Sequence, residues 1–92
     1  MVKVSKHDRK VRRIAAAYLG RGYSVRADLS DYQRPKPIRG RIPDVVATKG
    51  KTMKIIEVET PDSFRSDKDQ RDILRDYAKQ RRRTTFKVTR TR

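Results

Sequence analysis

The stretch from Gly40 to Thr60, GRIPDVVATKGKTMKIIEVET, decides the fold of this chain. Two runs rich in Val and Ile, at 45–47 and 53–58, flank a glycine-containing turn, and this pattern predicts two adjacent antiparallel strands. Pairing the strands brings Asp44, at the start of the first, beside Glu57, near the end of the second. Two carboxylates that converge on one spot repel each other, so the pair predicts a bound hard cation.

The motif formed by Pro43-Asp44 and then Glu57-Val58-Glu59 resembles that of the PD-(D/E)xK nuclease superfamily, the restriction-endonuclease-like fold that also includes archaeal Holliday-junction resolvases. The resemblance implies a metal-dependent nuclease in which Asp44 and Glu57 bind Mg²⁺ or Mn²⁺, with the Val58 carbonyl as a further ligand. The chain departs from the motif at Glu59, which occupies the family's lysine position. Some active restriction enzymes of the superfamily carry glutamate there, and so do some members that have lost activity.

Each of these acids also has a purely structural interpretation. Asp44 follows a proline and suits a turn. Glu57 lies in an apolar strand and suits an ion pair with one of the many arginines, because charged residues are rarely buried unpaired. Glu59 shares the strand face of Glu57 by the alternation of strand side chains and suits a solvated strand end. In a nuclease, Glu59 would instead receive a proton or help to hold a second metal ion.

The composition indicates one small domain over residues 1–92 with a polyanionic partner. The chain has 92 residues and a net charge of +15, which favours nucleic acid over a membrane as the partner. The family resemblance implies DNA in preference to RNA. No apolar run approaches the roughly 18 residues of a membrane span, and no signal-peptide pattern opens the chain. The chain has no cysteine, and its single His7 cannot build a zinc site alone. A cytoplasmic protein is expected.

The N-terminal part predicts a helix followed by a strand. The sequence Ser5-Lys6-His7-Asp8 has the pattern of a capping box, and apolar residues at helical spacing predict a helix over about 5–20. Alternation over 23–29 then predicts a strand with one apolar face. Asp8 resembles the helix acid that some resolvases add to the site, although helix capping explains it equally well. Asp28 is a lower-ranked alternative to it.

The segment 30–41 is basic and too rich in proline for a strand interior. We expect a loop that leads into the strand of Asp44. A basic loop is usually solvated, but beside an acidic metal pocket it is a candidate clamp for phosphate groups. Together with the arginines that end the second helix, the predicted nucleic-acid-binding residues are Arg34, Lys36, Arg39, Arg41, Arg81, Arg82 and Arg83.

After Thr60, a Pro-Asp-Ser sequence breaks the strand, and Ser66 is expected to cap a second helix. Gln70 heads an otherwise apolar stripe of this helix. It is either an ordinary glutamine at the edge of the core or, as in the RecB-like branch of the superfamily, a site residue. Tyr77 follows seven positions later, which is not the spacing of that branch, so only Gln70 is carried over as a candidate catalytic residue. A last strand is predicted at 85–89.

The predicted order is αβββαβ, which is the common core of the PD-(D/E)xK fold: a mixed four-stranded sheet flanked by helices. The chain would be a minimal version of that fold, and minimal versions often need a partner, so a homodimer is a candidate assembly. Three functions follow. The leading one is a metal-dependent nuclease, the second is a non-catalytic nucleic-acid-binding module on the same fold, and the third is a small basic ribosomal or chromatin-type protein.

Overall fold

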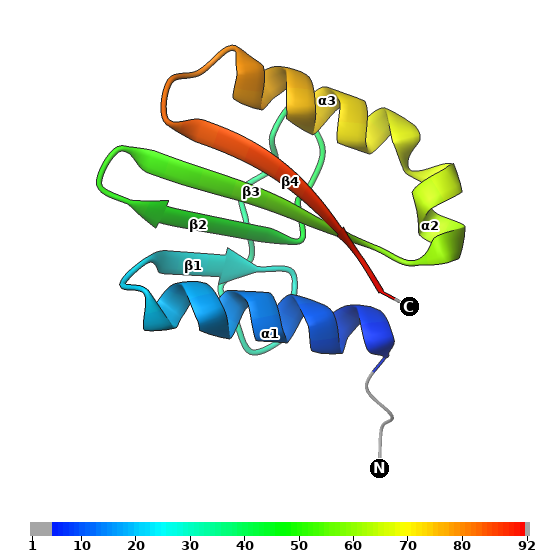
Figure 1. Ribbon diagram of the computed structural model, residues 1–92, viewed down its shortest axis with the longest axis horizontal. Helices are drawn as coiled ribbons and strands as arrows, with labels where there is room; N and C mark the ends of the chain where they lie inside the picture. The colour runs from blue at the N-terminus through cyan, green and yellow to red at the C-terminus, as the bar shows by residue number, and fades with distance from the viewer. Residues whose placement is uncertain (1–4, 92) are drawn as a thin grey trace.

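The computed structural model describes residues 5–91 and shows an α/β structure, in which a four-stranded mixed sheet is flanked by helices (Figure 1). The strand order is β1-β2-β3-β4. Strand β2 is antiparallel to both of its neighbours, β1 and β3, and β4 is parallel to β3. The predicted fold class is confirmed at this level. In chain order the elements are α1 (Lys6–Gly20), β1 (Ser24–Ala27), β2 (Val45–Lys49), β3 (Thr52–Glu59), α2 (Pro61–Ser66), α3 (Lys68–Lys79) and β4 (Thr84–Arg90).

The hairpin of β2 and β3 forms as the sequence predicts. Its register pairs Val45 with Ile56, so that the next position outward places Asp44 opposite Glu57. The turn between the strands contains Gly50, whose φ is +59°. Glycine adopts this left-handed conformation without the steric cost that a Cβ would impose.

The two faces of the sheet are covered by different helices. Helix α1 packs on one face and builds a hydrophobic core of Val11, Ala15, Ala27, Leu29, Val45, Ile56 and Val58. Because side chains alternate along a strand, Ile55, Glu57 and Glu59 of β3 point to the other face. There α3 packs against β3 and β4 and buries Arg71, Leu74 and Ala78. The acids of β3 therefore lie under α3.

The predicted N-terminal helix is confirmed to within one residue, and Ser5 caps it by accepting a hydrogen bond from the Asp8 N–H. The strand expected over 23–29 is shorter, at Ser24–Ala27. The chain turns out of the sheet after Ala27, and the Asp28 N–H donates to the Asp44 carbonyl at 2.9 Å. This bond ties the start of the long loop to the residue that ends it.

The predicted cap at Ser66 is wrong, because Ser66 is the last residue of a short helix that the sequence did not indicate. This helix, α2, starts at Pro61, where proline is tolerated because the first helical N–H has no intrahelical partner. Thr60 and Ser63 form its capping box. Helix α3 follows after Asp67, whose side chain makes no capping bond.

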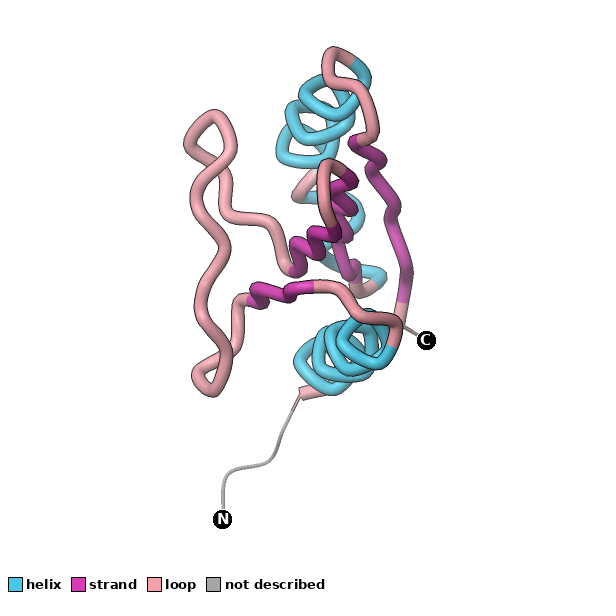
Figure 2. The backbone as a smooth tube through the Cα atoms, turned by 90° about the vertical axis from the view of Figure 1, so that its left-hand side faces the viewer, coloured by secondary structure: helices cyan, strands magenta, loops and turns pink. Residues whose placement is uncertain are grey.

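The segment between β1 and β2 is a long loop that stands off the sheet and returns to it (Figure 2). At its tip, Ile38 and Arg41 exchange two backbone hydrogen bonds of 2.7 and 2.9 Å. The two residues between them, Arg39 and Gly40, both have positive φ, at +49° and +79°. The Arg39 guanidinium donates to Asp76 at 2.9 Å, so the tip of the loop is fastened to α3.

Among residues 5–91, no helix combines the length and apolar character that crossing a membrane requires.

Candidate functional site

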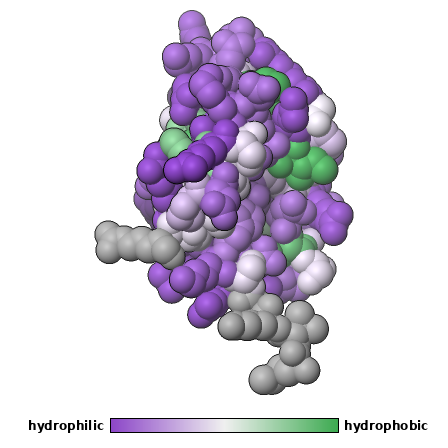
Figure 3. Space-filling model, turned by 90° about the vertical axis from the view of Figure 1, so that its right-hand side faces the viewer, coloured by the Kyte–Doolittle hydropathy of each residue, from purple (hydrophilic) through white to green (hydrophobic). Residues whose placement is uncertain are grey.

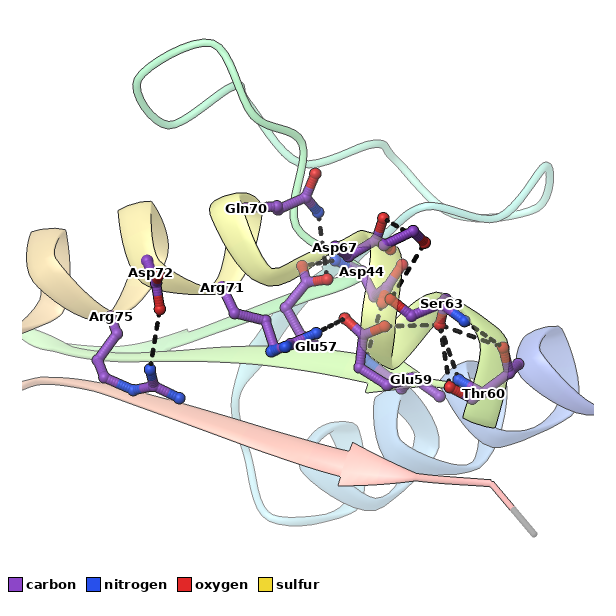
Figure 4. Close-up of polar contacts among 12 residues, drawn as sticks. Asp44, Glu57, Glu59, Thr60, Ser63, Asp67, Gln70, Arg71, Asp72 and Arg75 are labelled. Atoms are coloured by element: carbon purple, nitrogen blue, oxygen red, sulfur yellow. Dashed lines mark hydrogen bonds and ion pairs between the residues drawn. The ribbon is translucent and has the colours of Figure 1, made fainter.

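Asp44 and Glu57 meet at the edge of the β2–β3 hairpin, as the register requires (Figure 4). The Asp44 N–H donates to Glu57 Oε1 at 3.1 Å, and the Val58 N–H donates to Asp44 Oδ2 at 2.8 Å. Both side chains are largely withdrawn from solvent, since Glu57 is 2% exposed and Asp44 is 9% exposed. Each carboxylate is therefore held by the backbone of the other strand.

Glu57 is held without a basic partner. Gln70 of α3 donates its amide Nε2 to Glu57 Oε2 at 3.2 Å and also lies 3.3 Å from the Ile42 carbonyl oxygen. Within residues 5–91, no lysine or arginine forms an ion pair with Glu57, so the interpretation of Glu57 as half of an arginine pair is wrong. Burial, and next the charge of Asp44, raise the pKa of Glu57 to about 8.

His7, which the sequence reasoning set aside, lies next to the acid pair. Its Nε2 is 3.4 Å from Asp44 Oδ2, and its Nδ1 is 3.2 Å from Asp8 Oδ1. The hydrogen bond with Asp44 is the main cause that raises the pKa of His7 to about 9, so the ring is an imidazolium at neutral pH. Asp8 is thus linked to Asp44 through His7. The sequence did contain a signal for this contact, because His7 stands next to an acid in the first turn of the predicted helix.

Glu59 is buried in a network of its own. It is 1% exposed, so the interpretation of a solvated strand end is wrong. Ser63 Oγ donates to Glu59 Oε2 at 2.6 Å, and Arg71 Nη1 lies 3.9 Å from Glu59 Oε1. Neither Oε1 nor Nη1 has a hydrogen-bond partner among the described residues. Glu59 shares the strand face of Glu57, as predicted, but its carboxylate is directed to Ser63 and Arg71.

Arg71 was not proposed from the sequence. It is 7% exposed, and its guanidinium carbon lies 4.0 Å from the centroid of the Phe64 ring. The signal was available, because Arg71 precedes Leu74 and Ala78 by three and seven positions, which places an arginine on the buried stripe of the helix. An arginine at a buried position predicts a buried acidic partner.

The donor set at the acid pair fits a hard divalent cation. No group of three or more His, Asp or Glu side chains within residues 5–91 is arranged as a metal site. Mg²⁺, however, is usually bound by one or two carboxylates together with water and substrate phosphates. Asp44 and Glu57 supply the two carboxylates. The Val58 carbonyl points to the same neighbouring strand as its N–H, and hence to the side of Asp44.

The predicted nucleic-acid-binding residues lie on the loop between β1 and β2 and just after α3. Arg34 lies 3.7 Å from Asp28, and Arg39 is held by Asp76 and Gln80. The Arg81 guanidinium lies over the Tyr77 ring, with 4.9 Å from its carbon to the ring centroid. The remaining predicted residues are exposed, namely Lys36, Arg41, Arg82 and Arg83.

The sequence reasoning missed a second basic surface, between the start of α1 and the end of β4. Residues of both elements line a hollow of about 350 Å³: Lys6, Arg9, Lys10, Arg13, Arg90 and Thr91. This side of the molecule is largely hydrophilic (Figure 3). Its cations on α1 come from helical positions three and four residues apart, which places them on one face of the helix.

No protein-family model matches the chain, and no curated protein matches it.

Proposed function

We propose that the chain is a metal-dependent nuclease of the restriction-endonuclease-like fold, acting on DNA in preference to RNA. The order of α1, β1, β2, β3, α3 and β4 is the αβββαβ order of that fold, with α2 as an addition. The observation that carries the proposal is the buried pair of Asp44 and Glu57, in which Glu57 has no basic partner within residues 5–91. A purely structural acid pair would be costly to bury.

In this proposal, Asp44 and Glu57 hold Mg²⁺ or Mn²⁺, with the Val58 carbonyl as a further ligand. A bound divalent cation would stabilise negative charge on the scissile phosphate and lower the pKa of the attacking water. Gln70 holds Glu57 Oε2, and the His7 imidazolium holds Asp44 Oδ2. These contacts fix the rotamers of both carboxylates before substrate arrives.

Glu59 and Arg71 bear on whether the site is active. In the family motif, the position of Glu59 carries a lysine, which offsets phosphate charge and orients the water. Here the carboxylate is held by Ser63 and faces the Arg71 guanidinium, so α3 supplies a cation beside this position. A second candidate function is a non-catalytic nucleic-acid-binding module. It is favoured because position 59 of β3 carries a glutamate and not the lysine of the family motif.

The third candidate, a ribosomal or chromatin-type protein, gives no role to buried acids. The charge of +15 on 92 residues suits such a protein equally well, because it reports only an affinity for polyanions. Burying Glu57 and Asp44 side by side lowers stability without serving phosphate binding. The acid pair therefore favours the nuclease over a basic packing protein.

A cleavage assay tests the proposal. End-labelled single-stranded, duplex and branched DNA, and the matching RNA, are incubated with Mg²⁺ or Mn²⁺ and with EDTA. Cleavage is expected only with a divalent ion, and Asp44→Asn and Glu57→Gln should each abolish it while circular dichroism shows an intact fold. Asp69→Asn, at an exposed acid of α3, is the matched control. Intact nucleic-acid binding without cleavage of any substrate would make the binding module the better account.

A further inference from the structure

A hollow of about 660 Å³ lies between the long loop and the sheet. Val46, Thr48 and Met53 of the hairpin form its floor, Lys36 and Ile38 belong to the loop, and Tyr77 of α3 closes one side. We call this space the loop hollow. Figure 2 shows the loop arching away from the strands on this side. Its volume falls within the roughly 300–1,000 Å³ that is typical of small-ligand sites.

The loop hollow opens on the same face of the sheet as the acid pair. Val46 pairs with Ile55, and Thr48 pairs with Met53. Because strand side chains alternate, Met53 and Ile55 share the face of Glu57. Asp44 directly precedes β2, and Val46 lies two residues after it, which corresponds to about 7 Å in an extended chain. A nucleotide spans such a separation between its base and its phosphate.

We propose that the loop hollow binds one unpaired nucleobase of the nucleic acid, adjacent to the phosphate that reaches Asp44 and Glu57. The proposal rests on the proposed function for the role of the acid pair. It adds the class of substrate, which is a strand with an unpaired nucleotide beside the cleavage point, as in a flap, a bulge, a branch or a single strand. An uninterrupted duplex keeps its bases stacked and offers none to the hollow.

The lining has the chemistry that a base requires. Ile38, Val46 and Met53 offer apolar contact to the flat ring, while Thr48 offers a polar group. Proteins commonly bind unpaired bases by stacking them on aromatic rings and on arginine guanidinium planes. Tyr77 supplies such a ring at the border of the hollow.

Basic side chains surround the same ring. The guanidinium carbons of Arg39 and Arg81 lie 5.8 and 4.9 Å from the centroid of Tyr77. Arg26 and Lys36 line the hollow itself. A base carries a phosphate with it, so this combination of an apolar floor and a cationic border matches a nucleotide in shape and in charge. Arg39 is paired with Asp76, but within residues 5–91 a neutral apolar ligand would leave the other three cations without a counter-charge.

Binding of 2-aminopurine oligonucleotides in EDTA tests the proposal without requiring cleavage. The probe base is placed in a single strand, in a bulge or in a continuous duplex of DNA. Its fluorescence is expected to change on binding in the first two and to stay constant in the third. Tyr77→Ala should weaken binding of the bulged probe roughly tenfold, in line with the loss of one stacked base, while Tyr77→Phe keeps wild-type binding.

Two further variants complete the design. Thr48→Tyr fills the loop hollow from its floor and should abolish the fluorescence change even where Tyr77→Ala fails to fold. Tyr23→Ala is the matched control, because Tyr23 packs against Tyr18 at a centroid distance of 5.1 Å and does not line the hollow. Circular dichroism checks the fold of every variant.

The outcomes separate this inference from the proposed function. A fluorescence change that Thr48→Tyr removes supports the loop hollow, whether or not the protein cleaves. Cleavage that depends on Asp44, combined with equal fluorescence for paired and unpaired probes and no effect of Thr48→Tyr, would overturn the loop hollow and leave the nuclease standing. No binding of any probe at low salt would overturn both.

Discussion

Replacing Glu57 by glutamine should stabilise the metal-free protein, and the gain should grow as the pH rises. Burial and the neighbouring Asp44 raise the pKa of Glu57 from 4.5 to about 8. A carboxyl group with a raised pKa in the folded state ionises more readily in the unfolded chain, so wild-type stability falls as the pH rises from 4.5 through 8. The His7 imidazolium acts in the same direction over a higher range, because its contribution is present below pH 6.5 and is lost as the pH rises through about 9.

The size of the effect follows from the raised pKa of Glu57. At about 1.4 kcal/mol per pKa unit, the raised pKa of Glu57 lowers the free energy of unfolding by roughly 3 kcal/mol at pH 7 and by nearly 5 kcal/mol at pH 9. Glutamine avoids this cost but places an amide beside the amide of Gln70, at a cost of about 1 kcal/mol for a poorer hydrogen bond. The expected net gain is about zero at pH 5, about 2 kcal/mol at pH 7 and about 3–4 kcal/mol at pH 9.

Urea unfolding followed by circular dichroism, in EDTA at pH 5, 7 and 9, measures this gain. Asp69→Asn, at an exposed acid, is the control and should follow the wild-type profile. The Glu57→Gln profile should retain only the decline that His7 causes. Parallel profiles for Glu57→Gln and wild type, or a less stable Glu57→Gln protein at pH 9, would show that burial beside Asp44 does not destabilise the ionised form of Glu57.

Further predictions concern the remaining contacts. Arg71→Met should lower the free energy of unfolding by about 3–5 kcal/mol, because Glu59 is left buried and unpaired; a loss below about 1 kcal/mol in urea unfolding would contradict the pair. Glu59→Lys should destabilise the protein similarly in the same assay, since it puts a second cation beside Arg71. Gly50→Ala should cost about 1 kcal/mol at a φ of +59°, seen as a melting temperature lower by about 4–8 °C. The logarithm of the nucleic-acid affinity should fall with log salt by about 0.9 per neutralised duplex phosphate, and a flat titration would remove nucleic acid as the partner.

Local sequence patterns were sufficient to predict most of the fold. Helical spacing after Ser5 and the β-branched runs around Gly50 indicated α1 and the hairpin, because each buries a single apolar face against the same core. Helix α2 was missed because Pro61 reads as a strand breaker, although proline is also a favourable first residue of a helix. The capping box of Thr60 and Ser63 becomes visible only once that start is recognised.

The site was predictable where it depends on register and not where it depends on packing between distant segments. The pairing of two adjacent strands places Asp44 beside Glu57, and this follows from the position of a single turn. The contact of His7 with Asp44 joins residues 37 positions apart and depends on how α1 lies across the sheet. The contact between Arg71 and Glu59 likewise depends on which face α3 turns toward the sheet.

Anomalous diffraction from crystals grown with Mn²⁺ shows directly whether Asp44 and Glu57 bind a divalent cation. One strong anomalous peak is expected within coordination distance of both the Asp44 and Glu57 carboxylates, and it should be lost in crystals of Glu57→Gln. Mn²⁺ bound at full occupancy at other sites of the protein, with none at the acid pair and Glu57 still hydrogen-bonded to Gln70 and the Asp44 N–H, would contradict a metal site at Asp44 and Glu57.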